Sequence, residues 1–132
     1  MSINVMMSNI GVDTQDHLKL SVINEKPFKG EAGYYFSLAS VPLSHKEYIF
    51  VATPLKRGYF LVGGRQMLVG HTLTVRDRKG FSNYFSGEKY NAILTIREED
   101  KTESGITNYR GTLEIQYGSE KRKFKVHGRQ YH

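Results

Sequence analysis

The chain contains no cysteine, and this absence excludes several kinds of chemistry. Disulfide bonds cannot stabilise the fold, and neither a thiol nucleophile nor a cysteine-ligated zinc ion can be present. No apolar run approaches the roughly 20 residues that a membrane-spanning helix needs. The first residues, MSINVMMSNIGVD, contain neither a basic segment nor an apolar core. We therefore expect a cytoplasmic protein with no signal peptide and no membrane insertion.

Sequence motifs for catalysis and metal binding are also missing. The five histidines are scattered, and none has the spacing of a zinc-binding HxH or HExxH motif. The acidic segment 97–105, REEDKTESG, departs from the pattern of an EF-hand calcium loop. There is no nucleophile elbow, P-loop or dinucleotide-binding fingerprint. We therefore expect no cofactor, no metal and no catalytic residue.

What the chain does contain is typical of one globular domain. It has 132 residues, of which 39% are hydrophobic, and its nine tyrosines and seven phenylalanines exclude a disordered chain. A chain of this length buries enough surface for a core of its own, so residues 1–132 are expected to form a single domain. The net charge of +6 is uneven, because residues 56–132 carry 15 basic and eight acidic side chains. A basic half of this kind attracts polyanions.

Apolar residues alternate with polar ones in most of the runs between glycines. A period of two puts successive side chains on opposite faces of a β-strand, and no run shows the spacing of an amphipathic helix over three turns. The predicted strands span residues 17–24, 33–41, 47–53, 58–62, 66–76, 89–98, 108–117 and 121–128, with a ninth strand or a short helix at 3–10. Short connections favour antiparallel neighbours. We therefore expect an all-β fold, a mostly antiparallel barrel or sandwich of about eight strands.

The last predicted strand is the first candidate binding surface. In this strand Phe124 and Val126 alternate with basic residues, so one face is apolar and the other is cationic. The candidate residues are Lys121, Arg122, Lys123, Lys125 and Arg129. Cations grouped in this way bind phosphates or other acidic groups, and such binding weakens as salt rises. Lysines also protect an edge strand from aggregation or simply form a solvated face, so the charge has a second explanation.

The second candidate is the segment 76–90, RDRKGFSNYFSGEKY, which we expect to form a hairpin turn at 77–80 followed by a long loop. Its candidate residues are Arg76, Arg78, Lys79, Phe81, Tyr84 and Phe85. Bases stack on aromatic rings while cations hold phosphates, so the mixture suits single-stranded nucleic acid. The KGF at 79–81 matches the start of the RRM signature, but Ser82 and Asn83 then depart from it. The alternative is a loop whose rings fold back on the core.

Three functions remain open on these residues. We favour a small non-catalytic binding or protein-interaction module that uses its basic face to bind a protein partner or an anionic ligand. A nucleic-acid-binding β-barrel would use the same residues. A lipocalin-like barrel would instead hold a small apolar ligand in a cavity of at least about 300 Å³, lined by Tyr35, Tyr48 and Tyr59. An enzyme would need such a cavity, with a tyrosine or histidine as its acid–base group.

Overall fold

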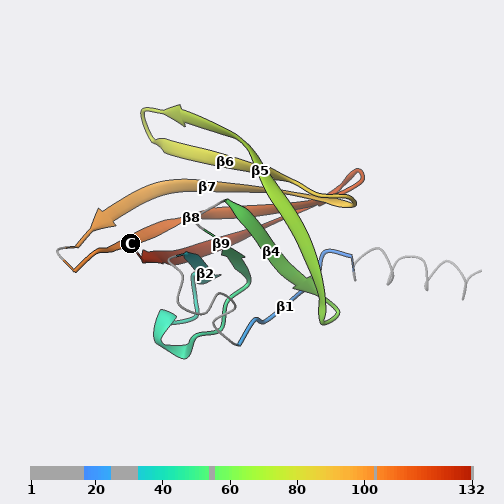
Figure 1. Ribbon diagram of the computed structural model, residues 1–132, viewed down its shortest axis with the longest axis horizontal. Helices are drawn as coiled ribbons and strands as arrows, with labels where there is room; N and C mark the ends of the chain where they lie inside the picture. The colour runs from blue at the N-terminus through green and yellow to red at the C-terminus, as the bar shows by residue number, and fades with distance from the viewer. Residues whose placement is uncertain (1–16, 25–32, 54–55, 103, 132) are drawn as a thin grey trace, which may run out of the picture.

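The protein is built almost entirely of β-strands (Figure 1). The computed structural model describes residues 17–24, 33–53, 56–102 and 104–131. The strands are β1 (Leu20–Ser21), β2 (Tyr34–Leu38), β3 (Phe50–Ala52), β4 (Arg57–Val62), β5 (Arg65–Asp77), β6 (Gly80–Ser86), β7 (Tyr90–Lys101), β8 (Ile106–Tyr117) and β9 (Glu120–Tyr131). A short 3-10 helix, η1 (Leu43–His45), lies between β2 and β3. Over the described ranges no helix is long and apolar enough to cross a membrane.

Eight of these strands form a closed antiparallel barrel. Each strand from β2 to β9 pairs with the strand that follows it, and β9 returns to pair with β2. In this closing pair, residues 34–38 lie opposite residues 126–130. β1 lies outside the ring and pairs with the end of β4. The all-β prediction is confirmed, and the β2–β9 pairing decides for a barrel rather than a sandwich.

Inward-facing side chains fill the barrel. Along the long strands, buried residues alternate with more exposed ones, as expected when one face of each strand meets the core. The largest side chains with no exposed surface include Phe36, Phe50, Phe60, Leu113 and Ile115. The ring centroids of Phe50 and Phe85 lie 5.2 Å apart in an edge-to-face arrangement. Because the interior is packed in this way, the outer faces and the strand edges are the surfaces that remain for binding.

The segment 76–90 is a strand where the sequence predicted a long loop. The turn at 77–80 is confirmed, but it leads directly into β6, which pairs with β5 on one side and β7 on the other. Phe81, Asn83 and Phe85 share the inner face of this strand. The polar Asn83 interrupts the apolar pattern, and its Oδ1 lies 3.0 Å from Nε2 of His71 and 2.6 Å from Oγ1 of Thr74. A partly buried amide that is satisfied in this way is compatible with an inward position.

Three other predicted strands are shorter than expected, and the run 33–41 contributes only the five residues of β2. The run 17–24 contributes only β1 and one isolated bridge between Ile23 and Tyr48. The run 47–53 contributes β3, whose three residues are all buried. Val51 of β3 packs outside the barrel in a second cluster with Ile23 and Tyr48, so this strand is covered on both faces. The predicted element at 3–10 lies outside the described residues.

Candidate functional site

The basic strand of the sequence is β9, and its cations lie on two faces. The outward-facing cations are Lys121, Lys123, Lys125 and Arg129. Arg122 lies on the same face of the strand as Phe124, and its guanidinium carbon is 5.0 Å from the centroid of the Phe124 ring. Arg122 is therefore not part of the outer basic surface, because successive residues of a strand face opposite ways.

The lysines of β9 lie along a partly free edge. β9 pairs with β8 over its whole length but with β2 only at residues 126–130. Among the described residues, Lys121 and Lys123 thus lie where β9 has one neighbour. The Nζ of Lys123 is 3.9 Å from Oε1 of Glu114, and this long contact to a largely exposed lysine contributes little stability. These lysines fit edge protection as well as binding, so a site requires further groups.

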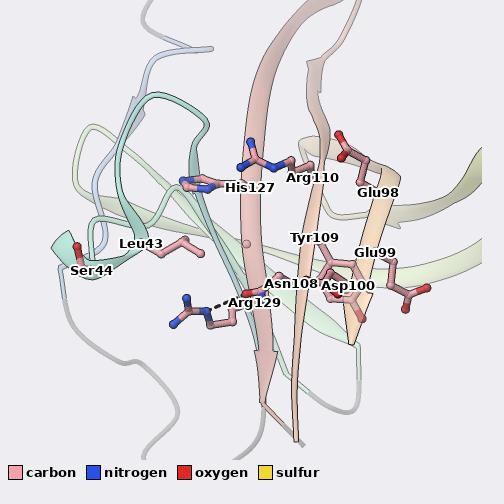
Figure 2. A pocket seen from close by; sticks show the side chains of 11 residues that line it. Leu43, Ser44, Glu98, Glu99, Asp100, Asn108, Tyr109, Arg110, His127 and Arg129 are labelled. Carbon is pink, nitrogen blue, oxygen red and sulfur yellow. Dashed lines mark hydrogen bonds between the residues drawn. The ribbon is translucent and has the colours of Figure 1, made fainter. Parts of the chain in front are cut away.

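A groove of about 610 Å³ provides such groups at the other end of β9 (Figure 2). β8 and β9 form its floor, the end of β7 forms one wall, and η1 forms the other. The lining residues are Leu43, Ser44, Glu98, Glu99, Asp100, Asn108, Tyr109, Arg110, His127, Gly128 and Arg129. Ligand pockets usually have volumes of roughly 300–1,000 Å³. This groove has a suitable size, and its lining is polar and charged rather than apolar.

Two guanidinium groups lie on the η1 side of the groove. In the β8–β9 register Arg110 lies opposite His127 and Asn108 lies opposite Arg129, so the arginines are diagonal neighbours on the outer face. The Nε of Arg129 donates a hydrogen bond of 3.0 Å to Oδ1 of Asn108. Figure 2 shows the guanidinium of Arg110 turned towards His127 and separate from the carboxylate of Glu98. Within the described ranges, no ion pair joins either arginine to a carboxylate.

His127 holds the η1 wall in place. Its Nε2 lies 2.5 Å from the carbonyl oxygen of Val41, in the segment that leads into η1. A carbonyl oxygen can only accept, so Nε2 carries the proton and Nδ1 of the neutral ring is left as an acceptor. This bond joins β9 to the segment that presents Leu43 and Ser44 to the groove.

The opposite wall is acidic. Glu98, Glu99 and Asp100 follow a bulge in β7, where the register with β8 shifts between Ile96 and Glu98. Across the strands Glu98 lies opposite Arg110, yet no ion pair joins these two described residues. The groove is therefore dipolar, with cations near η1 and carboxylates on β7.

Tyr109 lies beneath the floor with its ring towards the barrel interior. Its hydroxyl donates a hydrogen bond of 2.8 Å to Oε1 of Gln130. Burial raises the pKa of Tyr109 above its ordinary value of 10.0, and the neighbouring Tyr34 and the Glu99 carboxylate raise it further. The hydroxyl stays neutral near neutral pH, so the arginines and the acids set the charge of the groove.

The aromatic candidates of β6 do not form one surface. Phe85 is buried in the core, 5% exposed. Phe81 faces inward, where its ring packs edge-on against Tyr109 at 6.3 Å between centroids and the guanidinium carbon of Arg76 lies 5.0 Å from the ring centroid. Tyr84 alone faces outward, and it is half-buried. The three rings therefore offer no shared platform for stacked bases.

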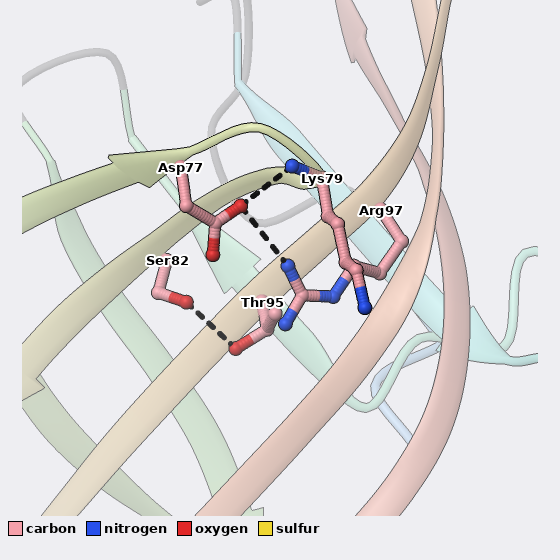
Figure 3. Close-up of polar contacts among 5 residues, drawn as sticks. All are labelled: Asp77, Lys79, Ser82, Thr95 and Arg97. Atoms are coloured by element: carbon pink, nitrogen blue, oxygen red, sulfur yellow. Dashed lines mark hydrogen bonds and ion pairs between the residues drawn. The ribbon is translucent and has the colours of Figure 1, made fainter.

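The cations of this hairpin lie at its turn. Arg76, Arg78 and Lys79 are all exposed. The turn is held by Asp77, whose Oδ1 accepts the Lys79 N–H at 2.7 Å and lies 3.5 Å from Nη1 of Arg97 (Figure 3). The hydrogen bond from Lys79, and then the charge of Arg97, hold the pKa of the Asp77 carboxyl below its usual value.

The basic strand and the β6 segment lie on separate parts of the barrel. The row of outward residues that starts at Tyr84 passes through Ile93 and Glu114 before it reaches Lys123. Three strand spacings separate its ends, about 14 Å along a curved sheet. The two surfaces that the sequence predicted are therefore not one continuous site.

In the part of the chain that the structure describes, the pocket that reaches the barrel interior is far too small for a ligand. A pocket between β2, β3, β5, β6 and β7 has a volume of about 20 Å³. Tyr35, Tyr48 and Tyr59, which we expected to line a cavity, pack instead with Ile23 and Val51 in the cluster outside the barrel. This arrangement gives no support to an internal apolar ligand.

The arginine of β8 and the histidine of β9 were missed by sequence reasoning. Arg110 and His127 both lie on the polar faces of predicted strands, and the tight turn between β8 and β9 sets the register that makes them opposite neighbours. Counting from that turn could have identified the pair. The contribution of η1 had no signal in the sequence.

No cluster of three or more histidine, aspartate or glutamate side chains that could hold a metal occurs among residues 17–24, 33–53, 56–102 and 104–131. The chain matches no protein-family model, and neither the curated proteins nor the solved structures provided a match to it.

Proposed function

We propose that this protein is a non-catalytic binding module that holds a partner protein in the groove between η1 and β7. The observation that carries the proposal is the pair of guanidinium groups of Arg110 and Arg129, which lie in a groove of about 610 Å³ with no carboxylate partner among the described residues. Two neighbouring cations repel each other, and an anionic group between them relieves that repulsion.

The acidic wall on β7 limits the partners that the groove can bind. An anionic group is favoured near η1, whereas a cation or a hydrogen-bond donor is favoured beside Glu98 and Asp100 on β7. Arranged charges of both signs fix the orientation of a partner and exclude partners with the wrong pattern. A protein surface carries both signs, so the groove suits a protein of mixed charge.

Nucleic acid fits the groove less well. Its backbone would bring phosphates close to the carboxylates of β7, and like charges at short range are unfavourable. The rings that the nucleic-acid hypothesis requires are also poorly placed, because Phe85 lies in the core and Phe81 faces inward. The lysines of β9 would then serve to attract an acidic partner from a distance rather than to bind it.

Fluorescence anisotropy with a labelled peptide tests the proposal. The probe is a Glu-Glu-Gly-Gly-Lys-Lys peptide, and labelled hexathymidylate serves as the nucleic-acid comparison. Arg110→Gln combined with Arg129→Gln removes two charges from the groove, and Lys121→Gln combined with Lys125→Gln removes two charges outside it. Because each charged hydrogen bond is worth roughly 1.5–3 kcal/mol, we expect the first pair to weaken peptide binding about tenfold or more and the second to change it much less.

Three outcomes would contradict this function. Equal losses in the two double variants would show that net charge alone attracts the peptide. No peptide binding by the unaltered protein would remove the groove as a site. Tighter binding of hexathymidylate than of the peptide would favour the nucleic-acid alternative.

A further inference from the structure

β5 is longer than the neighbour that closes the barrel beside it. β4 pairs with residues 65–70 of β5, and a bulge between His71 and Leu73 marks the point where the two strands separate. From there to Asp77, β5 pairs with β6 alone among the described residues. Figure 1 shows the β5–β6 hairpin extending beyond the start of β4. Residues 72–77 therefore present a free strand edge.

The hydrogen-bond pattern identifies the backbone groups that point to this edge. In an antiparallel pair, alternate residues bond to one neighbour and the residues between them point to the other side. The N–H of Gly87 bonds to the carbonyl of Tyr90, which places the bonds of residues 81, 83 and 85 on the β7 side of β6. Ser82 and Tyr84 therefore bond to β5.

The β5 residues opposite Ser82 and Tyr84 are Val75 and Leu73, respectively. The residues between and beside these, Thr74 and Arg76, consequently direct their N–H and C=O groups to the free edge. The N–H of His71, which bonds to the carbonyl of Lys56 on the β4 side, confirms this sense of alternation before the bulge. The free edge thus carries backbone donors and acceptors that no described residue of the chain pairs with.

The side chains along this edge favour a particular occupant. On the outer face Leu73 and Val75 are 53% and 46% exposed. On the inner face Arg76 is exposed beside the ring of Phe81. An added antiparallel strand places its side chains on the same face as those directly opposite. It would therefore need apolar residues opposite Leu73 and Val75, and acidic residues opposite Arg76.

The surrounding charge disfavours a second copy of the chain. The cations at this edge and at the adjoining start of β4 are Lys56, Arg57, Arg76, Arg78 and Lys79. The acidic residue within this group, Asp77, already accepts a hydrogen bond from the Lys79 N–H and lies beside Arg97. Pairing two such edges would bring like charges together, whereas an acidic strand is complementary.

We propose that residues 72–77 of β5 bind an extended acidic segment of a partner protein by strand addition. Main-chain hydrogen bonds to Thr74 and Arg76 supply the affinity, and the alternation of acidic and apolar residues supplies the specificity. The site lies on a different strand from the η1–β7 groove and goes beyond the function proposed for it.

The free protein gives a first test by amide hydrogen exchange measured by NMR. We expect the amides of Thr74 and Arg76 to exchange fast, while those of Leu73 and Val75 are protected by β6. Protection of Thr74 and Arg76 in the free protein would overturn the proposal, because the edge would already be occupied. Analytical ultracentrifugation then distinguishes a dimer, with a second copy on the edge, from a monomer whose own chain covers it.

The second test uses the peptide Ac-Glu-Val-Glu-Val-Glu-Val-NH2 at up to millimolar concentration. We expect NMR chemical-shift changes confined to residues 72–77 and their β6 neighbours, and slower amide hydrogen exchange at Thr74 and Arg76. The glutamates lie opposite Arg76 and Thr74, so their N–H groups face β5. N-methylation of the glutamates should weaken binding about tenfold or more, and N-methylation of the valines should be tolerated.

Charge provides the matched comparison. The corresponding Lys-Val peptide should bind at least about tenfold more weakly, and Arg76→Glu in the protein should reverse the preference between the two peptides. Equal effects of the two N-methylation patterns would exclude strand addition. Equal binding of the two peptides would exclude an acidic partner, and no shift with either would overturn the proposal.

Discussion

The pairing of β2 with β9, which closes the barrel, can be tested at one glycine. Gly128 of β9 lies opposite Phe36 of β2 in the closing pair. A Cβ at Gly128 would clash with Cδ1 of Phe36, and would lie 2.7 Å from Cε1 of that ring and 2.5 Å from the carbonyl oxygen of Tyr35. Phe36 has no exposed surface, so its ring has no empty space into which it can move.

We therefore expect Gly128→Ala to destabilise the protein. Forcing one carbon into a packed core costs about 1–3 kcal/mol. For a domain of this size, each kcal/mol lowers Tm by roughly 3–5 °C, so the fall should be about 3–15 °C. Urea unfolding followed by far-UV circular dichroism gives the free energy of unfolding. Tyrosine fluorescence is a second probe, since the chain has no tryptophan.

Gly70→Ala is the matched control. Gly70 also lies within a strand, but a Cβ there would meet no atom within 4 Å. This substitution should be neutral or slightly stabilising, because alanine reduces the freedom of the unfolded chain. Combining Gly128→Ala with Phe36→Leu, which removes part of the obstructing ring, should cost less than the sum of the two single changes.

The closing register would be refuted by two results. If Gly128→Ala were as harmless as Gly70→Ala, the ring of Phe36 could not lie against Gly128. If Gly128→Ala and Phe36→Leu were additive, the two residues would not be in contact, and β2 would not close the barrel against β9 in this register.

Two further predictions concern ionisation. The pKa of Tyr109 is raised by burial, so the contribution of this residue to stability is complete below the unfolded value of 10.0 and is lost as pH rises further. Tyr109→Phe should therefore reduce the loss of stability above about pH 10. Urea unfolding at several pH values measures this difference. The pKa of Asp77 is lowered mainly by the Lys79 N–H, so its contribution is complete above the unfolded value of 3.8 and is lost as pH falls. Arg97→Gln should leave most of this depression in place, and an NMR titration in which Asp77 returns to its ordinary pKa would contradict the assignment.

The strands of the C-terminal hairpin could be predicted because their signal is local. In β8 and β9, residues such as Leu113 and Val126 alternate with polar neighbours, and this period identifies both the element and its buried face. The same rule failed for β6, where Asn83 occupies an inward position. Its partners, His71 and Thr74, come from β5, so nothing in the neighbouring sequence indicates that a polar side chain is satisfied there.

The candidate sites were predictable only in part. The outward orientation of the β9 lysines follows from alternation, and the same alternation removes Arg122 from their face. The η1–β7 groove combines residues of four separate elements, and η1 is held to β9 by the bond from His127 to Val41. A contact between positions so far apart in the chain leaves no pattern in the local sequence.

The sequence by itself determined that the protein is an all-β domain, where most of its strands lie and which side chains those strands bury, because a strand's two faces follow from its own residues. Tertiary structure decided which strands are neighbours. It joined β2 to β9, placed Arg110 and Arg129 beside η1, and left residues 72–77 of β5 without a partner among the described residues. Those outcomes depend on packing the whole sheet around one core, and on where each strand ends relative to its neighbours.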